Sequence, residues 1–136
     1  MRAAVFRHSQ VLLVQEKIDG LWTLPGGYAD VGFSAAENAC KEVWEEAGIE
    51  VRATRLIAVR HKAKHPYPAD VRDFYKFMFL CEQVGDGQPT PGAETQGADF
   101  FSLDDLPPLS LGRTIEQDIS LAFAHYVDAD QPTVFD

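Results

Sequence analysis

A proline and two glycines interrupt the chain directly before its strongest helix signal. The strand-like run Leu21–Leu24 stops at Pro25-Gly26-Gly27, because proline cannot donate to a strand ladder and adjacent glycines favour a turn. Ser34 then precedes Glu37 at the spacing of a capping box, in which each side chain binds a free backbone N–H of the other. We therefore predict a strand, a loop and a helix that begins at Ser34 and ends at Gly48.

Three glutamates of this predicted helix share one face. At about 100° per residue, Glu42, Glu45 and Glu46 lie on one arc beside the apolar stripe. They repel one another, and the last helical turn disfavours anions. A solvated acidic face is the ordinary explanation of such a pattern. A bound divalent cation would reverse the sign of both effects, because hard cations such as Mg²⁺ bind carboxylate oxygens.

The rest of the chain predicts further strands and a second helix. The β-prone runs are Ala3–Phe6, Val11–Val14, Val51–Val59, Asp73–Leu80 and Ala98–Phe101. The first two are expected to form a hairpin with a four-residue connection, residues 7–10.

Towards the end of the chain, Thr114 and Gln117 resemble a second capping box and predict a helix with an apolar face. Residues 127–136 are expected to form a tail. Because no internal repeat or change in composition marks a boundary, we predict that residues 1–136 form one α/β domain.

Charge and composition exclude several classes of protein. Twelve basic residues against 21 acidic ones give a net charge of −9, which argues against general nucleic-acid binding. No apolar run approaches the roughly 20 residues of a membrane helix, so no membrane partner is expected. The N-terminal residues do not resemble a signal peptide, and a cytoplasmic location is expected. Cys40 and Cys81 are predicted to be buried apolar residues.

The segment from Gly27 to Ile49 closely resembles the Nudix box, G-x5-E-x7-R-E-U-x-E-E-x-G-U, where U is aliphatic. The matching positions are Gly27, Glu42, Val43, Glu45, Glu46, Gly48 and Ile49. A gapped pattern of this length, in a strand, loop and helix context, is a specific signal. The resemblance implies a Nudix-type α/β/α sandwich with a mixed β-sheet and a loop-helix-loop catalytic motif.

Two positions depart from the box. Phe33 stands where the family has its first glutamate, and Lys41 stands where it has arginine. The resemblance implies that these two residues interact in the family, so the loop is expected to be altered here. Glu37 lies one turn before Lys41, at a favourable i,i+4 spacing, and is the expected replacement partner.

The resemblance also implies a reaction, namely hydrolysis of a nucleoside diphosphate linked to another moiety, with a small nucleotide as substrate and Mg²⁺ or Mn²⁺ as cofactor. Metal ions suit this chemistry because they neutralise the phosphates and lower the pKa of the attacking water. By position, Glu42, Glu45 and Glu46 are the implied metal-binding and catalytic carboxylates, and the carbonyl of Gly26 is a further implied ligand. One of these carboxylates, or a glutamate outside the helix, is expected to act as general base.

Further candidates lie outside the box. Glu94 precedes Phe100 by six residues, where a distant catalytic glutamate often occurs in the family, and it equally fits an ordinary polar loop residue. The basic run that begins at Arg60 fits either a solvated loop or a site for a substrate phosphate. The candidate substrate-binding residues are Arg60, Lys62, Lys64, Lys76 and Arg113.

These observations leave two leading hypotheses. In the first, the chain is a Nudix hydrolase that cleaves an ADP-ribose-like or CDP-choline-like nucleotide. In the second, it binds nucleotide and metal with weak or no turnover, because Phe33 replaces the first glutamate of the box. The resembled subgroup often has an extra N-terminal helical segment, and a pocket built with that segment would be incomplete in this chain. A homodimer is compatible with the family resemblance.

Overall fold

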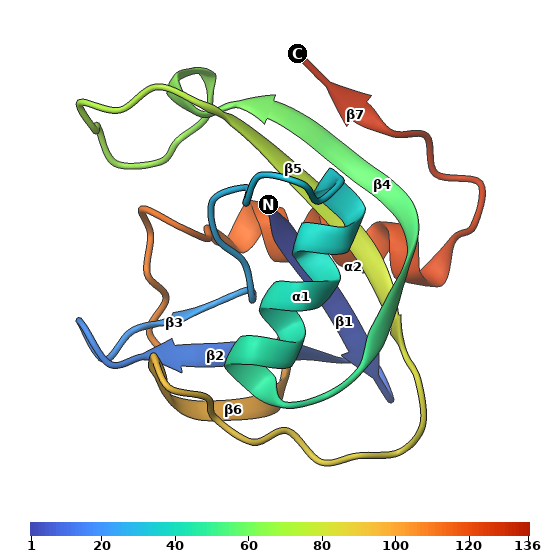
Figure 1. The fold of residues 1–136 in the computed structure, drawn as a ribbon. Coiled ribbons are helices and arrows are strands. Elements are labelled where there is room, and N and C mark those ends of the chain that lie inside the picture. Colours follow the sequence, from blue (N-terminus) through green and yellow to red (C-terminus); the bar gives the residue numbers. More distant parts are fainter.

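A mixed β-sheet with helices on both sides organises the chain (Figure 1). The computed structural model describes all 136 residues. Its elements, in chain order, are β1 (Arg2–Arg7), β2 (Gln10–Glu16), β3 (Trp22–Thr23), α1 (Ala35–Ala47), β4 (Val51–His61), the 3₁₀ turn η1 (Lys62–Lys64), β5 (Tyr75–Gln83), β6 (Thr95–Ser102), α2 (Glu116–Val127) and β7 (Val134–Phe135).

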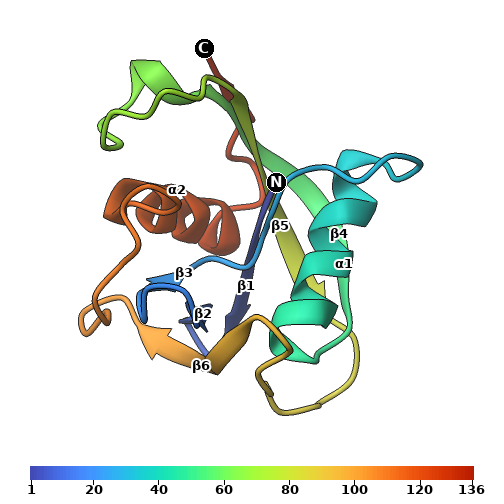
Figure 2. The ribbon, with the colours of Figure 1, turned by 60° about the vertical axis from the view of Figure 1, so that its left-hand side comes forward.

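The sheet follows the order β3-β2-β1-β5-β4-β7, and β6 pairs with β2 outside this path. Strand β1 is parallel to β5 and antiparallel to β2, so the sheet is mixed. Figure 2 shows α1 and α2 on opposite sides of β1 and β5. The predicted α/β/α sandwich with a mixed sheet is therefore confirmed.

Alternation along the central strands divides the hydrophobic core between the two helices. Ala3 and Val5 belong to the cluster that contains Val43 of α1, whereas Ala4 belongs to the cluster that contains Ile119 of α2. Successive side chains of a strand point to opposite faces, and a strand covered on both faces therefore reads as a continuous apolar run. This explains why β1 carries an apolar stretch between its two terminal arginines.

The β1–β2 connection is tighter than predicted. Arg7 pairs with Gln10, so only His8 and Ser9 form the turn, rather than four residues. Both have positive φ, 50° and 62°, as the favoured two-residue hairpin turns require. The sequence prediction was wrong because neither residue is the usual Asn or Gly of such a turn.

The second helix begins later than its predicted capping box. Helix α2 starts at Glu116, and Thr114 does not cap it. The hydroxyl of Thr114 instead bonds to Thr23 Oγ1 at 2.8 Å and accepts a bond from the backbone N–H of Leu24. Asp118 accepts the free backbone N–H of Ile115 at 3.1 Å. The hydrogen bond of Thr114 to Thr23 thus takes the place of the capping bond that the sequence spacing predicted.

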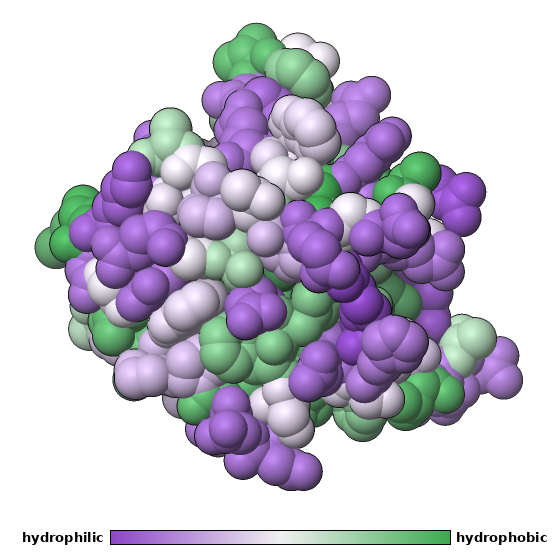
Figure 3. Space-filling model, turned by 90° about the horizontal axis from the view of Figure 1, so that it is seen from below, coloured by the Kyte–Doolittle hydropathy of each residue, from purple (hydrophilic) through white to green (hydrophobic).

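The predicted tail also contains structure, because β7 pairs in parallel with β4. Neither helix has the length and apolar character needed to cross a membrane. Figure 3 shows one face of the molecule, on which hydrophilic residues surround a central hydrophobic area.

Candidate active site

The glutamate-bearing helix α1 is fixed at its N-terminal end by the predicted capping box. The side chain of Ser34 accepts the backbone N–H of Glu37 at 3.1 Å, and the Glu37 carboxylate accepts the N–H of Ser34 at 2.7 Å. The helix ends at Gly48, whose φ of 66° is the left-handed conformation that glycine adopts without strain. The predicted boundaries are therefore confirmed.

The loop that precedes β6, together with Thr95 at the start of that strand, holds the C-terminal end of the same helix. The hydroxyl of Thr95, which is 1% exposed, donates to the carbonyl of Glu46 at 2.8 Å and accepts the N–H of Gly92 at 2.7 Å. The N–H of Thr90 binds the carbonyl of Ala47 at 2.7 Å. The last carbonyls of a helix lack intrahelical partners, so this loop supplies the donors they need. It also carries Glu94 beside Thr95.

Glu46 is the buried carboxylate of the site. It is 6% exposed, and its Oε1 accepts the backbone N–H of Gly26 at 3.0 Å. Its Oε2 is buried and has no hydrogen-bond partner. A buried polar atom without a partner is costly, and such an atom in a native structure often indicates a ligand or an ion.

Glu42 lies against the second glycine of the break. A Cβ atom at Gly27 would lie 2.6 Å from Glu42 Oε1, and one at Gly26 would lie 2.0 Å from the carbonyl oxygen of Met1. Gly26 therefore needs glycine for space, because backbone would block a Cβ there, whereas at Gly27 a Cβ would displace the Glu42 carboxylate. The glycines that were predicted to end the strand thus also allow the acidic helix and the start of β1 to approach this segment.

Glu45 takes a different direction from the other two glutamates. Its carboxylate pairs with Lys41 at 3.0 Å, and Lys41 also pairs with Asp30 at 2.6 Å. Glu37 does not pair with Lys41, so the predicted replacement partner was wrong, because capping Ser34 occupies that carboxylate. The ring centroid of Phe33 lies 5.7 Å from Lys41 Nζ. Asp30 thus supplies the negative charge that Phe33 lacks.

The donor set fits a cation at Glu46 and Glu42. Burial raises the pKa of Glu46 far above its ordinary value, the N–H of Gly26 and the charge of Arg2 lower it, and Glu16 and Glu42 raise it. A divalent cation would favour the ionised form and bind the unpartnered Oε2. No three His, Cys, Asp or Glu side chains converge in a metal-binding arrangement, and Glu45 would have to leave Lys41 to join such a set.

A cavity of about 660 Å³ adjoins these glutamates. Of the predicted site residues, it is lined by Gly26, Lys62, Lys76, Glu94 and Arg113. Glu42 and Glu46 do not line it themselves, but both contact the lining glycines Gly26 and Gly27. The cavity therefore brings a backbone carbonyl, a carboxylate and several cations close to the acidic helix.

Two of the predicted basic residues lie elsewhere. Arg60 is paired at 2.8 Å with the buried carboxylate of Asp118, and Lys64 is exposed in η1 and does not line the cavity. Tyr67 is 9% exposed and donates to the same carboxylate at 2.6 Å. Tyr67 is therefore committed to the packing of the loop against α2, and its ring is not free to stack on a base.

The cavity also contains residues that sequence reasoning missed, namely Arg2, Glu16, Tyr28 and Arg72. Arg72 donates to Asp70 at 2.8 Å and to the hydroxyl of Tyr28 at 2.9 Å, and so links two loops at the cavity. For Arg2 a signal existed, because a charged residue at the start of a strand buried on both faces needs a polar environment. The loop residues gave no comparable signal.

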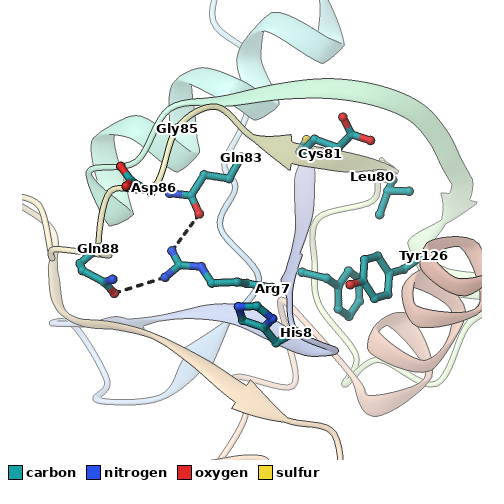
Figure 4. A pocket seen from close by; sticks show the side chains of 11 residues that line it. Arg7, His8, Leu80, Cys81, Gln83, Gly85, Asp86, Gln88 and Tyr126 are labelled. Atoms are coloured by element: carbon teal, nitrogen blue, oxygen red, sulfur yellow. Dashed lines mark hydrogen bonds between the residues drawn. The ribbon is translucent and has the colours of Figure 1, made fainter.

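A second cavity, of about 600 Å³, lies at the other end of β1. Figure 4 shows Arg7 in it, hydrogen-bonded to Gln83 at 2.8 Å and to Gln88 at 3.3 Å. Arg7 also donates to the carbonyl of Gly87 and lies over the ring of Phe100. Since these contacts already occupy the guanidinium, this cavity offers a ligand fewer free hydrogen-bonding groups than the first.

Comparisons with known proteins agree with the geometry. A family model described as NUDIX domain matches residues 2–122. A putative ADP-ribose pyrophosphatase of Bacillus subtilis is 44% identical over the whole chain, which spans 65% of that protein. The crystal structure of an ADP-ribose pyrophosphatase from Streptococcus suis is 44% identical with a TM-score of 0.90, over 99% of this chain and 96% of that one.

A solved UDP-X diphosphatase is 32% identical with a TM-score of 0.88, and the match covers 99% of this chain and 64% of that one. The chain thus spans slightly less than two thirds of two of these longer relatives. The matched residues include the whole glutamate-bearing unit and the strands that line the cavity. The chain therefore belongs to the Nudix hydrolase family.

Proposed function

We propose that this chain is a metal-dependent pyrophosphohydrolase that cleaves a small nucleoside diphosphate linked to another moiety, with ADP-ribose as the first substrate to test. The observation that carries the proposal is the buried carboxylate of Glu46, whose Oε1 accepts the N–H of the cavity-lining Gly26 and whose Oε2 has no hydrogen-bond partner. The names of the relatives support the substrate class, because ADP-ribose pyrophosphatase and UDP-X diphosphatase both denote a nucleoside diphosphate with an attached group.

Each group of residues has a proposed task in this reaction. Glu42 and Glu46 hold Mg²⁺ or Mn²⁺, with the carbonyl of Gly26 and, after release from Lys41, Glu45 as further ligands. When bound, the cation neutralises phosphate charge and lowers the pKa of the attacking water. Lys62, Lys76 and Arg113 line the cavity wall and now bind Asp70, the carbonyl of Arg113 and Asp19 respectively. They are proposed to exchange these partners for phosphate oxygens.

The remaining step is a proton transfer. The water oxygen forms a bond to phosphorus, one P–O bond of the anhydride breaks, and the water proton passes to a carboxylate. Glu94, which lines the cavity, or one of the helix glutamates accepts this proton. The products are a nucleoside monophosphate and a phosphorylated second moiety.

A binding module with little turnover is the alternative, and one contact favours it. Glu45 is engaged in an ion pair with Lys41, which also binds Asp30 and lies over the Phe33 that replaces an acidic residue of the family pattern. In this alternative nucleotide and metal bind, but the ligand set for catalysis is not completed.

A substrate panel separates the two functions. ADP-ribose, CDP-choline and other nucleoside diphosphate derivatives are incubated with Mg²⁺ or Mn²⁺, and monophosphate products are quantified. In ¹⁸O-labelled water, the labelled product identifies the phosphorus that is attacked. Glu46→Gln should abolish turnover, whereas the matched control Glu50→Gln, an exposed residue just after α1, should retain it. Nucleotide binding without turnover in the unmodified chain would favour the alternative, and full activity of Glu46→Gln would refute the metal assignment.

A further inference from the structure

Arg2 occupies an unusual position at the start of β1. It forms an antiparallel bridge with Gly26, and a Cβ atom at Gly26 would lie 2.9 Å from Arg2 Cδ. The next three residues of the strand are fully buried, whereas the side chain of Arg2 lines the cavity. The absence of a side chain at Gly26 thus makes room for an arginine that reaches the candidate active site.

Most of the hydrogen-bonding capacity of this guanidinium is unused. An arginine has five N–H donors, and the side chain of Arg2 makes one hydrogen bond, to the carbonyl of Leu24 at 3.0 Å. Arg2 forms no ion pair within 4.0 Å. By contrast, four other arginines each pair with a carboxylate: Arg52, Arg60, Arg72 and Arg113. Arg2 is therefore a partly buried cation with donors left over.

The charges around Arg2 indicate which kind of ligand its free donors suit. Glu46 bonds to Gly26, the bridge partner of Arg2, and Glu16 lines the same cavity as Arg2. These carboxylates are close enough to act on Arg2 and yet do not ion-pair with it. An anion held by cations at the glutamates would lie within reach of the same guanidinium. A phosphate suits the vacant donors, because the planar fork of arginine binds two phosphate oxygens at once.

We propose that Arg2 contacts the substrate and binds non-bridging oxygens of the pyrophosphate group beside Gly26. This inference rests on the proposed function, since it assigns a residue to the same reaction. It places a fixed positive charge where negative charge develops as water attacks phosphorus. Arg2 lies outside the Nudix-box segment, so the match to that pattern does not assign it.

The test compares anion binding with metal binding. The variants are Arg2→Met, which keeps an unbranched apolar side chain without the guanidinium, and Arg2→Lys, which keeps the charge without the fork. Arg52→Met is the matched control, because Arg52 is 73% exposed and pairs with Glu82 on the surface. For each protein, Mn²⁺ binding alone is followed by electron paramagnetic resonance. Binding of inorganic pyrophosphate and of the α,β-methylene analogue of ADP-ribose is followed by calorimetry with Mg²⁺ present.

We expect Arg2→Met to weaken binding of both phosphate ligands by roughly 10- to 100-fold, the effect of losing a charged hydrogen bond. Arg2→Lys should recover part of this loss, and Mn²⁺ affinity should not fall in either variant. A parallel loss of Mn²⁺ binding would overturn the proposal, because it would show that Arg2 only supports the loop at Gly26. Unchanged binding of the phosphate ligands would overturn it as well.

The same experiment keeps the two proposals apart. If the unmodified chain turns over no substrate but binds pyrophosphate through Arg2, the proposed reaction fails while the Arg2 site stands. If turnover is found and Arg2→Met binds and hydrolyses normally, the reaction stands and the Arg2 assignment fails. Arg2→Lys keeps the test decisive if Arg2→Met does not fold.

Discussion

Replacing Lys76 by methionine should remove a pH-dependent part of the stability of this protein. Lys76 is 8% exposed on β5, where its ammonium group donates to the carbonyl of Arg113 and lies 3.9 Å from the ring centroid of Tyr67. No carboxylate forms an ion pair with it. A lysine amine in such a place resists protonation, since burial disfavours the charged ammonium form.

The sign and size of the effect follow from the pKa of Lys76. Burial lowers this pKa from 10.5 to about 7, Asp118 raises it, and Arg2, Lys62 and Arg60 lower it. Between these two pH values the unfolded chain holds a proton that the folded chain has released, so the free energy of unfolding rises with pH across this window. Below about pH 7 the folded chain carries the full penalty. At about 1.4 kcal/mol per pH unit, the rise from pH 7 to pH 9 is on the order of 2 to 3 kcal/mol.

Urea unfolding, followed by the fluorescence of Trp22 and Trp44, provides the assay. The difference in free energy of unfolding between Lys76→Met and the unmodified chain is measured from pH 6 to pH 9. Taking the difference removes titrations that the two proteins share. Methionine also loses the bond to Arg113, a pH-independent cost of about 1 kcal/mol. Lys64→Met, at an exposed position, is the control. A difference that stays constant from pH 6 to pH 9 would refute the reasoning.

Four further substitutions test other contacts. Without divalent cations, Glu46→Gln should have the same melting temperature as the unmodified chain or a higher one. In a thermal-shift assay, Mn²⁺ should raise the melting temperature of the unmodified chain but not that of Glu46→Gln. Thr95→Val leaves the carbonyl of Glu46 without its donor and should cost about 1 to 3 kcal/mol in urea unfolding, and Thr95→Ser should restore most of it. Tyr67→Phe should cost about 1 kcal/mol in the same assay by removing its bond to Asp118. Phe33→Glu should leave the hydrolysis rate unchanged or raise it in the substrate panel, and a clear loss would show that Phe33 takes part in substrate binding.

Local signals predicted the acidic helix well. Ser34 and Glu37 bind each other as their spacing indicates, and Gly48 ends the helix in the conformation that glycine favours. The apolar runs also predicted where the long strands lie along the chain, but not their order in the sheet or the short β7. The same rule of spacing was wrong for Thr114, whose hydroxyl binds Thr23, and for Glu37 and Lys41. In both cases one side chain had two compatible partners, and contacts that sequence spacing does not show decided between them.

Site membership was harder to predict, because the cavity is assembled from distant segments. Arg60 and Lys62 are close in sequence, yet Arg60 pairs with Asp118 under α2 while Lys62 lines the cavity. The basic run alone did not distinguish them. Arg2 begins the first strand of the hairpin and Glu16 ends the second. The antiparallel register brings both to the open end of the hairpin, beside the same cavity.

The loop between β5 and β6 has two parts with different tolerance to changes in length. Around Gly85 and Asp86 the chain is exposed, and an added Cβ at Gly85 meets no other atom. Between Thr90 and Thr95, successive donors bind successive carbonyls of α1. The fold should therefore tolerate inserted residues at this tip, such as a short peptide tag. A single residue inserted after Gly92 would shift Glu94 and Thr95 out of step with the helix.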